Sequence, residues 1–184
     1  MDIKGVRLYE FRGNMTGERR REILATIQRK PGITFRALAR ELGLGIGDLQ
    51  YHLARLEKEG RVFSRKVGRR RYIFPGRMEE DAQRLLIAIS TETRRNILLL
   101  LMNRPMMQKE LAEALGISQP TINYHMSELL KLGVVRAEKK GRNVIYTLAY
   151  DPETVLRLVN EYRPGLWDKL ADGLIDLLAG GGWE

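Results

Sequence analysis

The sequence contains no cysteine and only two histidines. Without cysteine, the chain has no disulfide, thiolate metal site or cysteine nucleophile. The N-terminal residues lack the apolar core of a signal peptide. The longest apolar run, residues 97–102, is far too short to cross a bilayer. We therefore expect a cytoplasmic protein that has no membrane partner.

Signatures of catalysis are also missing. There is no phosphate-binding glycine loop, metal-ligand spacing or nucleophile motif. His52 and His125 occupy equivalent positions of an internal repeat, which suits packing or phosphate contact better than a catalytic pair. The Met106-Met107 pair is expected in the core rather than beside a cofactor. We expect no enzymatic activity, catalytic residue, metal or cofactor.

Positive charge dominates most of the chain. The 184 residues carry a formal net charge of +9, with a pI of about 10.0 and 43% hydrophobic residues. From Asp151 to Glu184 there are seven acidic and three basic residues, a net charge of −4, so residues 1–150 carry +13. A basic body of this size indicates a polyanionic partner, either nucleic acid or an anionic membrane surface.

An internal repeat organises the chain. Gln50-Tyr51-His52-Leu53 recurs as Asn123-Tyr124-His125-Met126 at an offset of 73 residues, and Leu42-Gly43 recurs as Leu115-Gly116. Upstream of residue 31 the offset becomes 74, where Arg20-Arg21 matches Arg94-Arg95. A period of this length is too long for a solenoid and fits two copies of a small domain.

Each copy reads as three helices followed by a hairpin. The first copy predicts a helix over 17–29, a short second helix that Thr34 caps and that ends at residue 42, and a third helix that ends at Gly60. Strands are predicted over 62–66 and 70–74. The second predicts helices near 92–103, 108–115 and 119–132, with strands near 134–139 and 143–149. Further helices are expected over residues 78–89, 152–162 and 166–179.

The pattern predicts a mainly α fold with small β-hairpin wings: two tandem winged helix-turn-helix domains plus C-terminal helices. The expected domains are an N-terminal segment (1–15), the first winged-helix domain (16–76), a linker helix (77–90), the second winged-helix domain (91–150) and the C-terminal helices (151–184).

The second copy offers a helix face suited to the DNA major groove. Ile122, Met126 and Leu129 recur on one face and are expected in the core. The outward positions are polar and free of lysine, and their amides and hydroxyls suit base edges and phosphates. The residues expected to contact DNA here are Ser118, Gln119, Thr121, Asn123, Tyr124 and Ser127.

The first copy is less typical. Gln50, Tyr51 and Arg55 suit nucleic acid, whereas Asp48 does not suit phosphate, and two glycines weaken the start of the helix. This copy is expected to contact DNA mainly through the backbone, or to hold a partner instead.

The hairpins carry concentrated positive charge. Residues 61–77 include seven basic residues and no acid, which favours a wing lying on phosphates over a merely solvated face. The expected contacts are Arg65, Lys66, Arg69, Arg70 and Arg71 in the first wing and Lys139, Lys140 and Arg142 in the second.

At these residues the chain resembles known families. Residues 89–98 and 111–125, with the wing residues Gly141-Arg142, resemble the ArsR-type winged-helix regulators. Residues 51–60, with the closing Tyr72-Ile73-Phe74-Pro75, are similar to the first module of archaeal tandem winged-helix regulators. Metal-sensing ArsR proteins carry paired cysteines where residues 106–111 have none, so thiolate metal sensing is excluded.

The expected function is sequence-specific binding of double-stranded DNA by a transcriptional regulator. The alternative is a winged-helix protein-interaction scaffold or basal transcription subunit, because fold alone does not imply DNA binding. RNA binding is a less favoured alternative, since only Tyr51 and Tyr124 offer aromatic rings on which bases could stack.

A homodimer is also expected, through the C-terminal and linker helices. Residues 152–162 place Val155, Leu158, Val159 and Tyr162 on one stripe, and residues 166–179 do the same with Trp167, Leu170, Ala171, Leu174 and Leu178. The alternative is that these helices cover the core of the second module.

Overall fold

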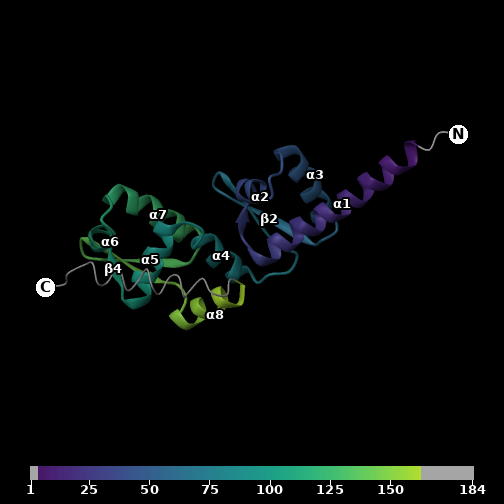
Figure 1. Cartoon of the computed structure of the whole chain (residues 1–184). Coiled ribbons are helices and arrows are strands. Elements are labelled where there is room, and N and C mark those ends of the chain that lie inside the picture. The colour runs from purple at the N-terminus through teal and green to yellow at the C-terminus, as the bar shows by residue number, and fades with distance from the viewer. Residues whose placement is uncertain (1–3, 163–184) are drawn as a thin grey trace. The chain divides into compact units, whose positions relative to one another are not determined.

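The computed structural model describes residues 4–162, with side chains from residue 17 onward. The chain forms two compact units that divide between Met78 and Glu79 (Figure 1). None of the helices in the described range combines the length and apolar character needed to span a bilayer.

The first unit contains three helices and a three-stranded sheet. In chain order these are α1 (Lys4–Arg29), β1 (Ile33–Thr34), α2 (Phe35–Glu41), α3 (Ile46–Lys58), β2 (Val62–Val67) and β3 (Arg70–Pro75). The strands are antiparallel in the order β1-β3-β2. Val67 pairs with Arg70, which leaves a two-residue turn whose first residue, Gly68, has a φ of 56°. Glycine adopts this conformation without steric cost, so the wing turns tightly here.

The predicted helix signals of this unit are present. The Thr34 hydroxyl accepts a hydrogen bond from the Ala37 amide at 3.3 Å, which confirms the N-cap. Leu49, Leu53 and Leu56 of α3 are buried in one core with residues of α1, α2 and the sheet. Burial of this leucine stripe holds α3 in place by the hydrophobic effect.

The second unit repeats this order and adds a helix at each end. Its elements are α4 (Glu80–Ala88), α5 (Glu92–Asn103), β4 (Met106–Met107), α6 (Gln108–Leu115), α7 (Gln119–Lys131), β5 (Val135–Lys140), β6 (Asn143–Leu148) and α8 (Pro152–Tyr162). The sheet order β4-β6-β5 matches that of the first unit. The sequence repeat is therefore a repeat of architecture.

The structure differs from the sequence prediction in three elements. Helix α1 begins at Lys4, well before the predicted residue 17. The two-residue strands β1 and β4 were not predicted, because so short a strand leaves no alternating pattern. Met106 pairs with Tyr146 and is buried, as expected for a core residue.

The last described helix requires a correction to the predicted dimer surface. Val155, Leu158 and Val159 of α8 are buried, and α8 packs against α4 within the same unit. The stripe expected to meet a second copy therefore covers the unit's own helix instead. The reason is that α4 also carries a wide apolar face, which would otherwise be exposed. The predicted helix 166–179 lies outside the described residues.

Asp151 caps the N-terminus of helix α8. Its carboxylate accepts hydrogen bonds from the Thr154 amide at 2.8 Å and the Thr154 hydroxyl at 2.7 Å. These bonds lower the pKa of Asp151, with the hydroxyl contributing most. Just before it, the Tyr150 hydroxyl donates to Asp81 of α4 at 2.8 Å. The chain leaving the second wing is thus tied back to α4.

Candidate nucleic-acid interface

Helix α7 of the second unit begins with a defined cap. Ser118 is the N-cap, and its hydroxyl lies 2.8 Å from the Thr121 hydroxyl and 3.4 Å from the Thr121 amide. Pro120 stands in the first turn, where its missing N–H has no cost. Two of the predicted DNA contacts, Ser118 and Thr121, therefore also order the start of the helix.

The two faces of α7 separate as the sequence predicted. Ile122, Met126 and Leu129 are fully buried. The residues proposed to contact DNA are all exposed: Ser118, Gln119, Thr121, Asn123, Tyr124 and Ser127. The Tyr124 side chain is 66% exposed. Because the core face is rigidly packed, the polar face projects at a fixed angle.

Helix α6 braces the start of α7. The Gln108 side-chain amide donates to the Gln119 backbone carbonyl at 3.0 Å. At the start of α6, the Glu110 carboxylate accepts a bond from the Met107 amide at 2.6 Å and pairs with Arg104 at 2.8 Å. The bond from the Met107 amide is the main cause that lowers the pKa of Glu110. The sequence reading missed these bracing residues, although the spacing from 107 to 110 is that of a capping box.

The two histidines are packing groups. His125 is half-buried and its pKa is lowered, mainly by burial and next by the charge of Arg94. It is therefore neutral at pH 7 and offers no charge to a phosphate. His52, the equivalent residue, is 5% exposed, and its Nε2 lies 3.4 Å from an Asp48 carboxylate oxygen. Of the two roles open from the sequence, packing is the one that the geometry supports.

The second wing presents cations to solvent. Lys139, Lys140 and Arg142 are exposed on strand β5 and in the turn before β6. The only carboxylate on this hairpin, Glu138, lies 3.9 Å from Lys140 in an exposed pair. Such a pair is worth little, so the cations remain available to a polyanion.

Helix α3 of the first unit carries a different surface. Gln50, Tyr51 and Arg55 are exposed, and the Arg55 guanidinium lies 5.2 Å from the centre of the Tyr51 ring. Asp48 is exposed in the first turn of the same helix. No side chain caps this helix, whose N-cap is Gly45. The face is more mixed in charge than that of α7.

Arg71, one of the expected phosphate contacts, is held against α3. Its guanidinium donates to Gln50 at 2.8 Å, to Glu57 at 2.9 Å and to Ser64 at 2.8 Å. Glu57 also accepts a hydrogen bond from Ser64. Arg71 is 27% exposed and links the wing to α3. Because Glu57 is half-buried, its carboxylate attracts the nearest cation, which is Arg71. The contact is therefore structural, and it also engages Gln50.

The other basic residues of the first wing differ from Arg71. Lys66, Arg69 and Arg70 are exposed around the turn. Arg65 is half-buried on β2. Three exposed cations, Lys66, Arg69 and Arg70, therefore lie at the tip of this wing.

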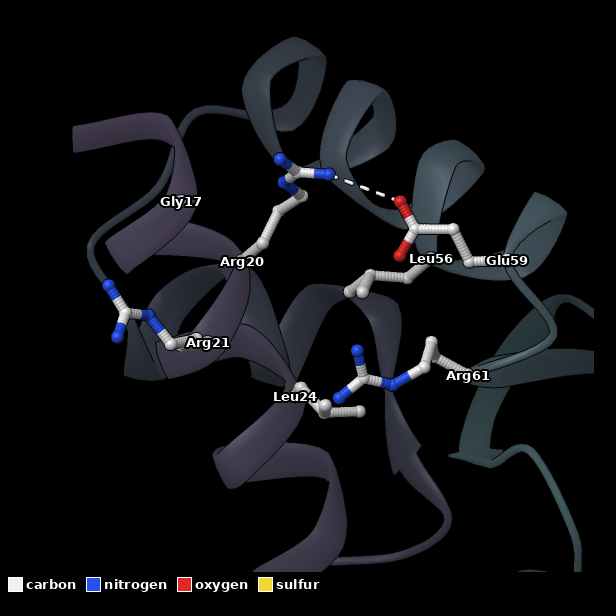
Figure 2. Close-up of a pocket in the computed structure, with 7 residues that line it drawn as sticks. All are labelled: Gly17, Arg20, Arg21, Leu24, Leu56, Glu59 and Arg61. Atoms are coloured by element: carbon white, nitrogen blue, oxygen red, sulfur yellow. Dashed lines mark hydrogen bonds and ion pairs between the residues drawn. The ribbon is translucent and has the colours of Figure 1, made fainter. Parts of the chain in front are cut away.

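A small cavity separates α1 from the end of α3 (Figure 2). Its volume is about 220 Å³, and Leu24 and Leu56 contribute apolar walls. Arg20 and Glu59 point toward each other across it and form an ion pair at 3.1 Å, whereas Arg21 points away. The pair joins α1 to the C-terminal end of α3 and helps to fix the angle of α3.

Each unit thus includes a core of three helices followed by a β-hairpin wing, and the last of these three helices presents a face to solvent beside that wing. This arrangement defines the class of winged helix-turn-helix proteins. Comparison with known proteins places the chain within the class. Residues 17–86 match a family model described as an N-terminal HTH domain, of the HVO_0163 type, and residues 91–137 match the bacterial regulatory protein, arsR family.

Individual proteins are also similar to parts of this chain. An uncharacterised HTH-type transcriptional regulator of Methanocaldococcus jannaschii is 29% identical over 143 residues, which cover 78% of this chain and 36% of that protein. The transcriptional repressor SdpR of Bacillus subtilis is 39% identical over 61 residues, which cover 33% of this chain and 68% of SdpR. The structure of HlyU from Vibrio cholerae matches with 30% identity and a TM-score of 0.40, covering 45% of this chain and 91% of HlyU.

The chain belongs to the helix-turn-helix transcriptional regulators, and its second unit carries the ArsR-family module. It spans about a third of the length of its Methanocaldococcus relative.

Proposed function

We propose that this protein binds double-stranded DNA in a sequence-specific manner and regulates transcription, as a tandem winged-helix regulator of archaeal type. Helix α7 reads bases in the major groove, and the two wings hold phosphates. The observation that carries the proposal is the exposed polar face of α7 from Gln119 to Ser127, which contains no lysine and lies in the same unit as a hairpin of exposed cations. A face meant only for solvent would carry lysine and glutamate, whereas amides and hydroxyls match base edges.

The two units share this task unequally. Gln119 and Asn123 project from α7 with no charged neighbour before Glu128. In the first unit, Gln50 is engaged by Arg71, and Asp48 disfavours phosphate. We assign base reading to the second unit and backbone contact to the first, through Lys66, Arg69 and Arg70, with Tyr51 and Arg55 beside them.

A protein-docking scaffold would present a contiguous apolar patch on these helices. Among the described residues, the large exposed apolar side chains are scattered over several elements of both units. This distribution favours DNA over a protein partner for the α7 face.

The test begins by selecting a cognate duplex from a random pool with the full chain. Gln119→Ala and Asn123→Ala are then expected to weaken binding to that duplex by about 1–3 kcal/mol each, and binding to random DNA much less. Asn160→Ala, an exposed amide on α8, is the matched control and should change neither. Equal losses on cognate and random DNA would mean that these side chains do not read bases.

We also infer that the protein forms a homodimer. The support is the apolar stripe of residues 166–179, with Trp167, Leu170, Leu174 and Leu178 at helical spacing. The stripe of α8 no longer contributes, because α4 covers it. A symmetric dimer would favour a pseudo-palindromic operator, with half-sites about 10–10.5 base pairs or a multiple apart.

A further inference from the structure

A second, larger cavity lies in the first unit, between helix α2 and the wing. Its volume is about 820 Å³, within the range of small-ligand sites. Five arginines from α2 and β3 and its preceding turn line it, and the lining includes no acidic residue: Arg36, Arg40, Arg69, Arg70 and Arg71. A concave surface with charge of one sign concentrates the electrostatic field and attracts the opposite charge.

Four of these arginines lack a counter-ion. Arg71 is neutralised by Glu57. Arg36, Arg40, Arg69 and Arg70 are exposed, and none of their guanidinium groups has an ion-pair or hydrogen-bond partner among the residues the structure describes. The carboxylate next to Arg40 in sequence, Glu41, is engaged by Arg29 and Lys30 instead. Neighbouring positive charges without counter-ions repel one another. A bound anion would therefore stabilise this cluster of arginines.

The second unit shows that the fold does not require this charge. At the positions equivalent to Arg36, Arg40, Arg69 and Arg70 it carries Lys109, Glu113, Arg142 and Asn143. The formal charges at these four positions sum to +4 in the first unit and to +1 in the second. Within the second unit, Lys109 and Glu113 also lie 3.7 Å apart. The unit whose helix is better suited to reading bases therefore carries less positive charge at these positions, so the winged-helix fold itself does not account for the extra charge of the first unit.

We propose that the cavity between α2 and the wing is a binding site for a small ligand that carries two or more phosphate groups. Guanidinium groups match phosphate oxygens in a bidentate geometry, and four unpaired ones supply enough donors for a polyphosphate. Within the wall of the site, Arg71 is held in place by Gln50, Glu57 and Ser64. The first unit is thereby a ligand-binding module as well as a DNA-contacting one.

The test is calorimetric titration of the full chain with sodium tripolyphosphate and, separately, with ATP, at fixed ionic strength. The variant Arg40→Glu/Arg70→Asn installs the residues that the second unit carries at the same positions, so the fold tolerates them. The matched control, Arg21→Glu/Lys58→Asn, makes the same change in net charge at exposed sites away from the cavity. Both variants are checked for folding by thermal melting.

Saturable binding of one ligand per chain is expected, weakened about tenfold or more by the cavity variant and little by the control. Absence of saturable binding up to about 1 mM overturns the proposal, as does an equal loss in both variants. In a parallel arm, the same proteins are titrated with random duplex DNA. If the cavity variant weakens only duplex binding, and tripolyphosphate does not bind, the cavity serves the DNA backbone; the small-ligand proposal then fails while the proposed function stands.

Discussion

Arg69 and Arg71 lie two residues apart in the most basic segment of the chain, yet their environments differ. Arg69 is exposed in the turn of the first wing, whereas Arg71 is bound to Gln50, Glu57 and Ser64. The side chains of the Arg71–Glu57 ion pair are only about a quarter exposed. Such a pair is stronger than a fully exposed one because solvent screens it less. A count of positive charges along the sequence therefore overstates the number free to meet phosphate.

The first prediction follows from this difference. Arg71→Ala should lower the free energy of unfolding by about 1–3 kcal/mol, because it removes the cation paired with the half-buried Glu57 and the hydrogen bonds to Gln50 and Ser64. Arg70→Ala, in an exposed site next to it, should change stability by less than about 0.5 kcal/mol. Urea denaturation of both variants measures this, and equal effects would contradict the structural role of Arg71.

A second prediction concerns Glu110. Its folded pKa is lowered, mainly by the bond from the Met107 amide, so its contribution is fully present above the unfolded pKa and is lost as the pH falls through the folded value. Glu110→Ala should cost about 1 kcal/mol at pH 7, the usual value of such a cap. The difference from the parent protein should shrink below about pH 4.5.

Chemical denaturation at pH 7 and at pH 4 measures the effect. Glu113→Ala, an exposed position on the same helix, is the control and should cost little at either pH. A cost for Glu110→Ala that does not change with pH would show that the carboxylate charge is irrelevant to the cap.

At the scale of elements, the wings combine a tight turn with a short third strand. Strands β1 and β4 each pair with the second strand of their hairpin, β3 and β6, and so anchor it to the helices. The hairpin tips carry the exposed cations. A wing that is anchored at one end and charged at the other suits contact with the DNA phosphate backbone. Such a contact positions the protein on the DNA without reading its sequence.

The wing prediction is made for Arg69 and Arg70 alone, since changing Arg71 would also disturb α3. Replacing both with alanine should weaken specific and non-specific DNA binding alike. The slope of log affinity against log salt should flatten by about 0.9 for each phosphate that the wing no longer neutralises. Fluorescence anisotropy at several salt concentrations measures the slope, and an unchanged slope would mean that the first wing is off the DNA.

At the scale of the whole molecule, the chain consists of two units of repeated architecture, and the second carries extra helices. Because α8 covers α4, a chain that ends at Tyr150 would expose the apolar face of α4. A truncation that tests dimerisation must therefore keep α8.

We expect the full chain to run as a dimer in light scattering at micromolar concentration, and a chain ending at Tyr162 to run as a monomer that keeps its helical content. The reason is that the sequence of residues 166–179 carries an apolar stripe at helical spacing. A full chain that runs as a monomer, or a truncated chain that stays dimeric, would contradict this assignment.

The sequence alone determined the repeat, the order of helices and wings, and the buried and exposed faces of α7, because these depend on local signals: periodicity, caps and glycine turns. It did not determine which cations are free, where α8 packs, or that four arginines from α2 and the wing share one cavity. Those features join residues distant in sequence, such as Arg40 with Arg70 and α4 with α8, and only tertiary packing brings them together. Local pattern specifies the modules, and the folded chain decides which of their charges and apolar faces remain for a partner.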